Sequence, residues 1–235
     1  MSQPENQPDN VVPICGPVGD ALAGFQSLIP EGLLAKLDDP EFIAEQDRRY
    51  EARQRREQAA EARIRLDTMR RGGAPRRATE RVANGSLEGT MAMAAIEAWS
   101  GQGLLVLSGG VGCGKTTAAV WWLSRHGGTA PMFVRAGGLE AAGRYDRAVR
   151  AMWTASSALC IDDVGAEYAD GRGNWISLLD EIADFYHGEM RPLIMTTNIE
   201  KAVTFRQRMG DRISSRIRED GGWCPIGGDD LRGRK

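Results

Sequence analysis

The stretch "GLLVLSGGVGCGKTT", residues 103–117, decides the fold of this 235-residue chain. Its first half is a short apolar run that predicts a buried strand, and it passes through a glycine turn into "KTTAAVWWLSRH", which predicts a helix. Residues Gly109–Thr116 fit the pattern G-x-x-x-x-G-K-[ST] between a strand and a helix, which is the context that the pattern requires. We therefore interpret this stretch as a Walker A phosphate-binding loop.

The residue types of this loop have a direct chemical reason. Glycines let the backbone fold into a ring of N–H donors without Cβ clashes, and the following helix offers its positive end. Lys115 is predicted to reach the β- and γ-phosphates, and the Thr116 hydroxyl is predicted to ligate Mg²⁺. The predicted nucleotide-binding residues are Gly109, Gly110, Val111, Gly112, Cys113, Gly114, Lys115, Thr116 and Thr117.

Outward from the loop, helical segments alternate with short apolar ones. The apolar segments are "APMFVRA", "ALCIDD" and "PLIMTTN", and amphipathic stretches such as "NWISLLDEIADFYHG" separate them. Alternation of this kind, with continuous rather than alternating apolar strands, is typical of a parallel sheet that helices cover on both faces. The predicted fold class is a three-layer α/β fold of the P-loop NTPase type.

A second motif, "ALCIDDVGAE" at residues 158–167, is an apolar strand that ends in two acids. A parallel strand beside the P-loop strand would bring its last carboxylate to the same crevice. Asp162 is then predicted to hold Mg²⁺ through water, and Asp163 to orient the attacking water. Asp163 is one methylene shorter than the glutamate usual at such a place, which leaves its strength as a base open. An ordinary loop entry is the alternative interpretation of the pair.

A third motif, "PLIMTTN", is an apolar strand that ends at Asn198. If this strand lies between the two strands already described, Asn198 can hydrogen-bond the γ-phosphate or the lytic water. The alternative is that Asn198 caps a helix that begins in "TTNIEKAV", because asparagine is a favoured N-cap residue. Both roles remain open on the sequence.

The stretch "MGDRISSRIRED", residues 209–220, predicts a helix with two distinct faces. Ile213 and Ile217 share one face, and Arg212 and Arg216 share another that lies about 100° round the helix. We expect the isoleucines to anchor the helix and the arginines to lie at its rim.

Two functions are open for the rim arginine Arg216. Exposed arginines are by default solvated or paired with neighbouring acids, here Asp211 and Glu219. The chain offers no other evident cation after Lys115 for the charge of a transition state, so Arg216 is also a candidate arginine finger that acts on a neighbouring subunit.

The N-terminal third has a different composition. Residues 1–40 are acidic and dotted with proline and glycine, which is typical of a leader without fixed structure. The apolar patch "ALAGFQSLIPEGLLAKL" leaves a short helix or a docking peptide open as the alternative. Residues 41–71 are rich in Ala, Glu, Gln and Arg and predict a charged helical arm of roughly 45 Å. Alanine supplies most of its apolar positions, so we expect the arm to project from the domain. Residues 72–85 read as a linker, and the compact domain is expected to begin near Ser86.

Composition excludes several classes of protein. The formal net charge of −2 and a pI near 5.8 argue against a protein that coats nucleic acid, so any contact with DNA must be local. No apolar run approaches the length of a membrane span, and the polar start "MSQPENQPDN" lacks the features of a signal peptide. The two histidines and widely spaced cysteines form no evident zinc site, and we expect a cytoplasmic protein. The cysteines are Cys15, Cys113, Cys160 and Cys224.

The motifs, taken in order, carry a family resemblance. "GGVGCGKTT", "LCIDDVGAE", "LIMTTNI", "GDRISSRIRE" and the ending "PIGGDDLRGRK" are similar to the DnaC/IstB-like branch of the AAA+ ATPases over residues 86–235. That branch contains helicase loaders and transposition helper ATPases. The resemblance implies an AAA+ core, here expected to lack the helical lid domain that many AAA+ proteins have.

The resemblance also assigns roles to individual residues. It implies that Lys115, Thr116, Asp162 and Asp163 bind and hydrolyse MgATP, and that Asn198 matches sensor 1. Arg216 matches the arginine finger, and Arg212 matches the other family arginine of the same helix. Glu167 and Arg232 receive no firm role.

The function that the resemblance implies is that of an ATP-dependent loader of a DNA replication helicase. Such a loader is expected to bind the hexameric replicative helicase through its N-terminal region and single-stranded DNA through its ATPase core. It is also expected to form a homo-oligomer in which Arg216 acts in trans. The alternative is a transposition helper ATPase that recruits a transposase to DNA, because it would share the whole core. A P-loop small-molecule kinase, with a substrate pocket and an arginine-rich lid inside one subunit, is a more distant alternative.

Overall fold

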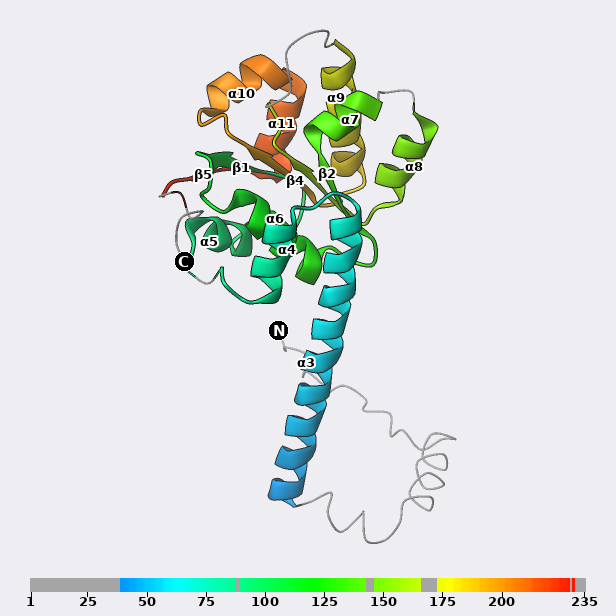
Figure 1. The fold of residues 1–235 in the computed structure, drawn as a ribbon, viewed down its shortest axis with the longest axis vertical. Coiled ribbons are helices and arrows are strands. Elements are labelled where there is room, and N and C mark those ends of the chain that lie inside the picture. Colours follow the sequence, from blue (N-terminus) through cyan, green and yellow to red (C-terminus); the bar gives the residue numbers. More distant parts are fainter. Residues whose placement is uncertain (1–38, 88, 143–145, 166–172, 229, 231–235) are drawn as a thin grey trace, which may run out of the picture. The chain divides into compact units, whose positions relative to one another are not determined.

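The computed structural model describes residues 39–87, 89–142, 146–165, 173–228 and 230 (Figure 1). The chain divides into two units, Met1–Arg56 and Glu57–Lys235. The leader predicted for residues 1–40 lies outside the described residues except for its last two, as do Glu167 and Arg232. None of the helices in the described part is both long and apolar enough to cross a membrane.

The second unit is built on a sheet of five strands that all run parallel. Their order across the sheet is β2-β3-β4-β1-β5, so β4 lies between the P-loop strand β1 and the acidic strand β3. The strands are β1 (Leu104–Gly109), β2 (Pro131–Arg135), β3 (Ala158–Asp162), β4 (Leu193–Thr197) and β5 (Gly222–Ile226).

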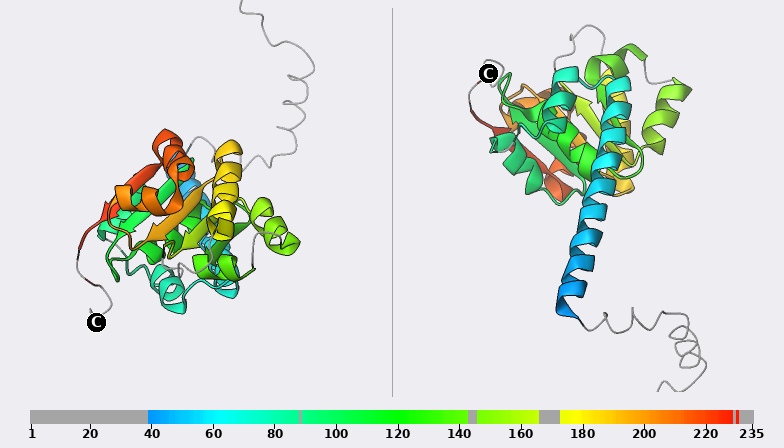
Figure 2. Two further views of the ribbon diagram at one scale, coloured as in Figure 1. Left: turned by 90° about the horizontal axis from the view of Figure 1, so that it is seen from above. Right: turned by 60° about the horizontal axis from the view of Figure 1, so that its bottom comes forward.

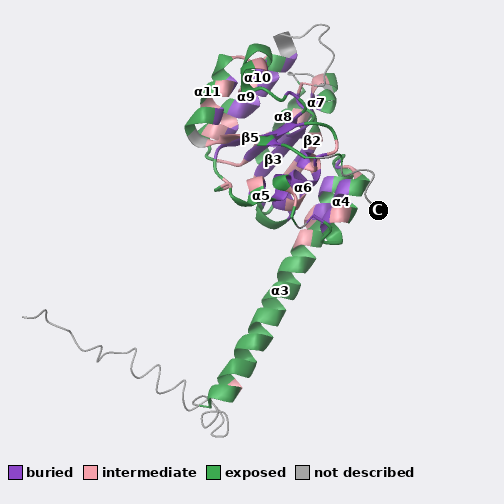
Figure 3. Ribbon diagram, turned by 90° about the vertical axis from the view of Figure 1, so that its left-hand side faces the viewer, coloured by how far each residue is buried: buried purple, intermediate pink, exposed green. Residues whose placement is uncertain are grey.

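Successive residues of the central strands point to opposite faces of the sheet, and both faces are buried. In β1, Leu105 and Leu107 belong to one apolar cluster, whereas Leu104 and Val106 belong to the other. All six residues of β1 are buried, which explains its continuous apolar sequence. Figure 3 shows these buried strands between the outer helices.

Helices cover the two faces in two groups (Figures 1 and 2). The first group packs on the face of Leu105 and consists of α4 (Arg76–Ala83), α5 (Met91–Glu97) and α6 (Lys115–His126). The second group packs on the opposite face and consists of α7 (Ala136–Ala142), α8 (Arg147–Ala155), α9 (Gly173–Gly188), α10 (Ala202–Met209) and α11 (Asp211–Asp220). The predicted three-layer α/β fold is therefore confirmed.

Strand β5 was not predicted from the sequence. It is short and contains Pro225, which has no N–H group to donate to a neighbouring strand. The structure accommodates this proline because β5 is an edge strand that pairs only with β1 among the described strands. The edge position is a property of the whole sheet, so the local sequence did not reveal it.

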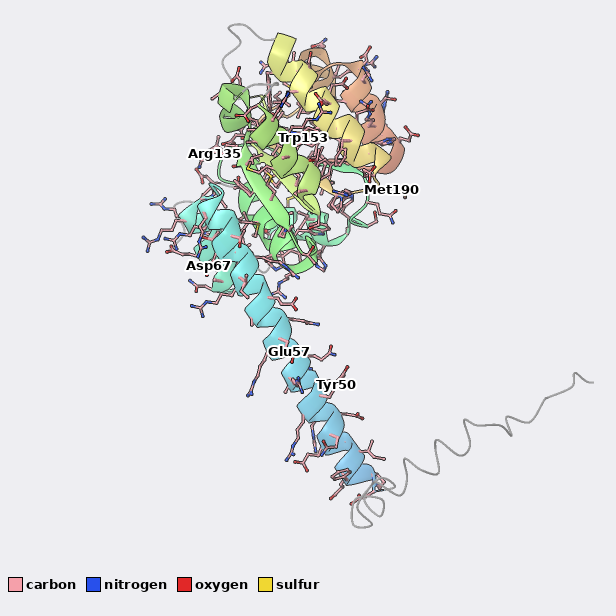
Figure 4. The ribbon with its side chains drawn as sticks, turned by 90° about the vertical axis from the view of Figure 1, so that its right-hand side faces the viewer. Tyr50, Glu57, Asp67, Arg135, Trp153 and Met190 are labelled. Atoms are coloured by element: carbon pink, nitrogen blue, oxygen red, sulfur yellow. The ribbon has the colours of Figure 1, made fainter. Side chains whose placement is uncertain are left out.

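Helix α3 spans Pro40–Arg71, where the sequence predicts a helix. Salt bridges four residues apart stabilise it, among them Glu45 with Arg49 and Glu61 with Arg65. Its side chains stand outward along most of the helix, and Tyr50 and Glu57 mark two of them in Figure 4.

The C-terminal end of α3 and the segment after it differ from the sequence expectation. Leu66 and Met69 are buried in the same apolar cluster as α6. In place of the linker predicted for residues 72–85, helix α4 buries Ala78 and Val82 against that cluster. The small side chain of Ala78 permits close packing in a segment whose arginines and glycines suggest solvent exposure. The apolar core thus begins well before Ser86.

The buried face of α11 gives a stability prediction. Replacing Ile213 with alanine is expected to lower the free energy of unfolding by about 2–5 kcal/mol, because its side chain is fully buried and the change leaves a cavity. Urea unfolding followed by circular dichroism measures the difference. Ser215→Ala, on the exposed side of the same helix, is the matched control and is expected to leave stability nearly unchanged. Equal stability of both variants would contradict the packing described here.

Candidate functional site

The predicted phosphate-binding loop joins β1 to α6 at the carboxyl edge of the sheet. Gly114 precedes the first residue of α6 with φ +94°, and no side chain caps this helix end. The first N–H groups of α6 are therefore oriented as anion donors. Gly112 has φ +85°, and the carboxylate of Asp230 lies where a Cβ on Gly112 would stand. A larger residue at this position would meet both backbone strain and a steric clash.

Lys115 is buried at the base of this loop. Its Nζ donates to the carbonyl oxygens of Gly109 and Gly110, each at 2.7 Å, and to Oδ1 of Asn198 at 3.2 Å. The ammonium group therefore lies between the loop and the end of strand β4. A bound phosphate would exchange with one of these neutral acceptors, so the amine is already oriented toward the place that the sequence predicts for the nucleotide.

Asp162 is the buried carboxylate of the site. Its Oδ1 accepts hydrogen bonds from the Thr116 hydroxyl at 2.8 Å and from the Thr196 hydroxyl at 2.7 Å. The predicted magnesium ligands thus meet, although α6 and β3 are far apart in the sequence. A hydroxyl beside a carboxylate fits Mg²⁺, which takes few ligands from the protein and completes its octahedron with phosphate oxygens and water. The described residues hold no cluster of three or more His, Cys, Asp or Glu side chains for a cation.

The electrostatics of Asp162 reflect this position. Burial raises the pKa of its carboxyl above the usual range, the repulsion of Asp163 acts in the same direction, and hydrogen bonds from Thr196 and Thr116 oppose the rise. The positive charge of Arg135, the register partner of Asp162 on β2, also opposes it (Figure 4). A divalent cation at this place would favour the ionised carboxylate in the same way.

Asp163 follows directly and lies on the surface of the site. Its φ of +62° is uncommon for a residue other than glycine, and its N–H donates to the Thr196 hydroxyl at 3.0 Å. Thr196 therefore fixes both acids, since the same hydroxyl donates to Asp162. Asp163 lines the cavity at the predicted phosphate loop together with Lys115 and Asn198.

Asn198 follows β4, between the ends of β1 and β3. The alternative that Asn198 caps a helix is wrong, because α10 begins at Ala202 and its N-cap residue is Lys201. Its side chain instead accepts the hydrogen bond from Lys115. Strand order explains this placement, since β4 lies between β1, which leads into the loop of Lys115, and β3, which ends at Asp162.

Lys115, Asp163 and Asn198 line one cavity of about 100 Å³, whereas Asp162 and Thr196 are not among its described lining residues. The described residues that line it are Arg81, Val111, Gly112, Gly114, Lys115, Thr116, Thr117, Asp163 and Asn198. Sequence reasoning missed Arg81, because it lay in the predicted linker and no motif marks it. It also gave no role to Thr196, whose position in "TTN" at the end of a strand is the available signal.

Arg216 lies elsewhere, on α11, and does not line this cavity in the described part of the chain. Its guanidinium forms ion pairs with Asp180, at 2.8 Å, and with Asp184, and its side chain is only 12% exposed. Arg212 also reaches Asp180, at 3.1 Å, but is 70% exposed. Both isoleucines of the helix are buried, as predicted.

The acids expected beside Arg216, Asp211 and Glu219, are not its partners. Asp211 pairs with Arg206 at 2.5 Å, and Glu219 lies 3.6 Å from His187. The reason lies in the tertiary structure. Two aspartates one turn apart on α9 face the side of α11 that carries the arginines.

Comparison with known proteins finds similarity at the level of structure. No family model and no curated protein matches the chain. A crystal structure of the DnaC helicase loader matches with a TM-score of 0.45 and 20% identity, covering 62% of this chain and 90% of that one. A crystal structure of DnaI matches with a TM-score of 0.46 and 20% identity, covering 60% and 81%.

The AMPPCP-bound DnaA of Aquifex aeolicus is also similar, with a TM-score of 0.42 and 19% identity. That match covers 67% of this chain and 48% of DnaA. The helicase loader family that the motifs resemble is thus among the similar solved structures. In this chain the P-loop motif follows β1 and the two acids follow β3, both at the carboxyl edge of the five-stranded parallel sheet.

Proposed function

We propose that this protein is an AAA+ ATPase that loads a replicative DNA helicase. The observation that supports the ATPase part is a pair of contacts at the carboxyl edge of β1, β4 and β3. Lys115 donates to Asn198, and Thr116, the next residue, donates to Asp162. A lysine for the phosphates, a carboxylate beside a threonine hydroxyl for Mg²⁺ and a neutral amide for the γ-phosphate or water are the groups that hydrolysis of ATP requires. When bound, Mg²⁺ would neutralise charge on the β- and γ-phosphates.

The chain's own residues would divide this work. Lys115 and the loop N–H groups would bind the phosphates, with Thr116 and Asp162 holding the metal. Asp163 would orient the attacking water. Thr196 would keep both acids in place through its single hydroxyl, which contacts each of them.

The loader part of the proposal draws support from the motif resemblance and from helix α3. Residues 40–56 of the first unit form part of a helix that is polar on nearly every side and carries exposed ion pairs four residues apart. A helix of this kind offers charged contacts rather than an apolar seam. It suits a partner-binding arm, and a replicative helicase is the partner that the resemblance implies.

The test uses the full chain and the replicative helicase of the same organism. We expect the two proteins to elute together from a sizing column with ATP, and we expect single-stranded DNA to change the ATPase rate more than duplex DNA of the same sequence does. The rate per subunit should also rise with protein concentration, because subunits must assemble. Co-elution with a transposase and not with the helicase would overturn the loader assignment in favour of the transposition helper. Phosphate transfer to a metabolite, with no response to DNA, would indicate a kinase.

A further inference from the structure

Arg81, in the last turn of helix α4, lies at the phosphate cavity although it precedes the P-loop by many residues. It lines the 100 Å³ cavity together with Lys115, Asp163 and Asn198. No motif of the P-loop fold assigns a function to it. We therefore examined what a positive charge at this position can bind.

The fold holds the backbone of Arg81 in position. Val82, the next residue, is buried in the apolar cluster on α6. The carbonyl oxygen of Arg81 accepts hydrogen bonds from the N–H and the hydroxyl of Ser86, each at 3.1 Å. Glu80, the acidic neighbour in the sequence, is paired with Arg76 at 2.6 Å. Val82 thus packs the end of α4 against the core, and Ser86 satisfies the carbonyl group of Arg81. The side chain of Arg81 lines the cavity.

Two cations are among the described residues that line the cavity, Lys115 and Arg81, together with the acid Asp163. Two further carboxylates lie beside its lining residues, that of Asp162 at Thr116 and that of Asp230 at Gly112. Lys115 is buried and its ammonium group already faces three acceptors. Arg81 is half-buried and lines the same cavity. A guanidinium can bind two phosphate oxygens at once in a planar arrangement, which an ammonium group cannot do.

Arg81 also lines a second, larger cavity, of about 550 Å³, between α4, α5 and α6. Apolar side chains form much of its wall, among them Leu87, Met93 and Trp121. Its volume lies in the range of cavities that hold small molecules. Arg81 is thus shared between a polar cavity for phosphates and an apolar one large enough for a nucleoside.

We propose that Arg81 is a nucleotide-binding residue, which holds the phosphate chain of a nucleoside di- or triphosphate from helix α4 of the same subunit. This inference rests on the proposed ATPase function. A bound nucleotide then joins α4 to the P-loop, so α4 opens less often when the site is filled. Because residues 72–75 connect α4 directly to α3, the same contact ties the end of the arm to the state of the nucleotide site.

The experiment measures the dissociation constant of a fluorescent ADP and a fluorescent non-hydrolysable ATP analogue with the full chain. Arg81→Gln is expected to weaken both by about 10- to 100-fold, which is the range for loss of charge-assisted hydrogen bonds. Arg77→Gln, an exposed arginine of the same helix, is the matched control and should bind as the wild type does. Arg81→Lys keeps the positive charge but loses the planar guanidinium that can bind two oxygens at once. Its dissociation constant should therefore lie between those of Arg81→Gln and Arg77→Gln. Circular dichroism confirms that each variant is folded.

Hydrogen exchange gives a second measurement. If Arg81 had only a structural role, nucleotide would not change the exchange rate of α4. ADP should slow exchange in residues 76–83 of the wild type and of Arg77→Gln, but not of Arg81→Gln. Equal affinities of Arg81→Gln and Arg77→Gln, with equal protection of α4, would overturn the inference and leave the ATPase proposal intact. The proposed function would instead be overturned if the wild type bound no nucleotide. It would also be overturned if the Lys115→Ala variant bound nucleotide as tightly as the wild type does. Should Arg81→Gln not fold, the Arg81→Lys comparison decides.

Discussion

Replacing Arg216 with alanine is expected to lower ATP turnover by the assembled protein roughly 10³- to 10⁵-fold, if Arg216 is the arginine finger of a neighbouring subunit. A guanidinium placed at the γ-phosphate stabilises charge that develops only in the transition state, so nucleotide affinity should change little. The fold should survive, because Asp184 is exposed and Asp180 keeps Arg212 as a partner. ATPase rates at several protein concentrations, together with nucleotide dissociation constants, measure the two effects separately.

A mixing experiment tests whether the arginine acts between subunits. Arg216→Ala protein keeps an intact phosphate loop, and Lys115→Ala protein keeps an intact Arg216, so a mixture should regain part of the activity at mixed interfaces. Arg218→Ala, on the exposed side of the same helix, serves as the control and should retain normal turnover. If the mixture regains no activity, or if isolated monomers turn over ATP at the full rate, the assignment in trans fails.

The ion pairs of Arg216 add a condition to this prediction. Within its own chain the guanidinium is held by Asp180 and Asp184 on α9. To reach a neighbour's phosphate it must exchange these carboxylates for phosphate oxygens. Asp184→Asn should therefore leave turnover unchanged or raise it if Arg216 acts in trans. If Arg216 only stabilises the packing of α9 against α11, both Asp184→Asn and Arg216→Ala should lower the free energy of unfolding. Neither should then cause a specific loss of turnover.

Lys115→Ala is the second substitution with a large expected effect. Turnover should fall roughly 10²- to 10³-fold or more, as when a positioned charge-stabilising donor is removed, and binding of ATP should weaken as well. The cause is that Lys115 is the buried cation of the phosphate cavity, held by two carbonyl groups and Asn198. Isothermal titration with ATP and a phosphate-release assay measure the two losses. Lys201→Ala, an exposed lysine at the start of α10, is the matched control. Normal ATP hydrolysis by Lys115→Ala would contradict the site.

Much of the candidate site could be predicted from short motifs because each depends on local geometry. The glycine pattern of the P-loop is recognisable since only glycine adopts φ +85° and +94° at Gly112 and Gly114 without strain. Asp162 and Asn198 could be placed near Lys115 because parallel strands bring their carboxyl ends to one edge of a sheet. The sequence left the role of Asn198 open, and strand order together with the N-cap of α10 decided against a cap.

Arg81 and Arg216 show why the remaining parts could not be predicted. The contacts of Arg216 depend on how α9 packs against α11, and the position of Arg81 depends on helix α4 packing into the core. Neither packing has a periodic signature strong enough to recognise in the local sequence. Segment 72–85 was read as a linker because its arginines and glycines suggest solvent, whereas a few small apolar side chains were enough to fold it onto α6.

The sequence by itself therefore determined the three-layer α/β fold and the phosphate loop. It also placed the acidic pair and the asparagine at strand ends, because backbone geometry and the alternation of apolar segments encode these features locally. Only the tertiary structure decided which strands are neighbours, which acids hold Arg216, and that Arg81 reaches the phosphate cavity. These are contacts between segments distant in the chain, and the packing of side chains between layers, rather than any local pattern, fixes them.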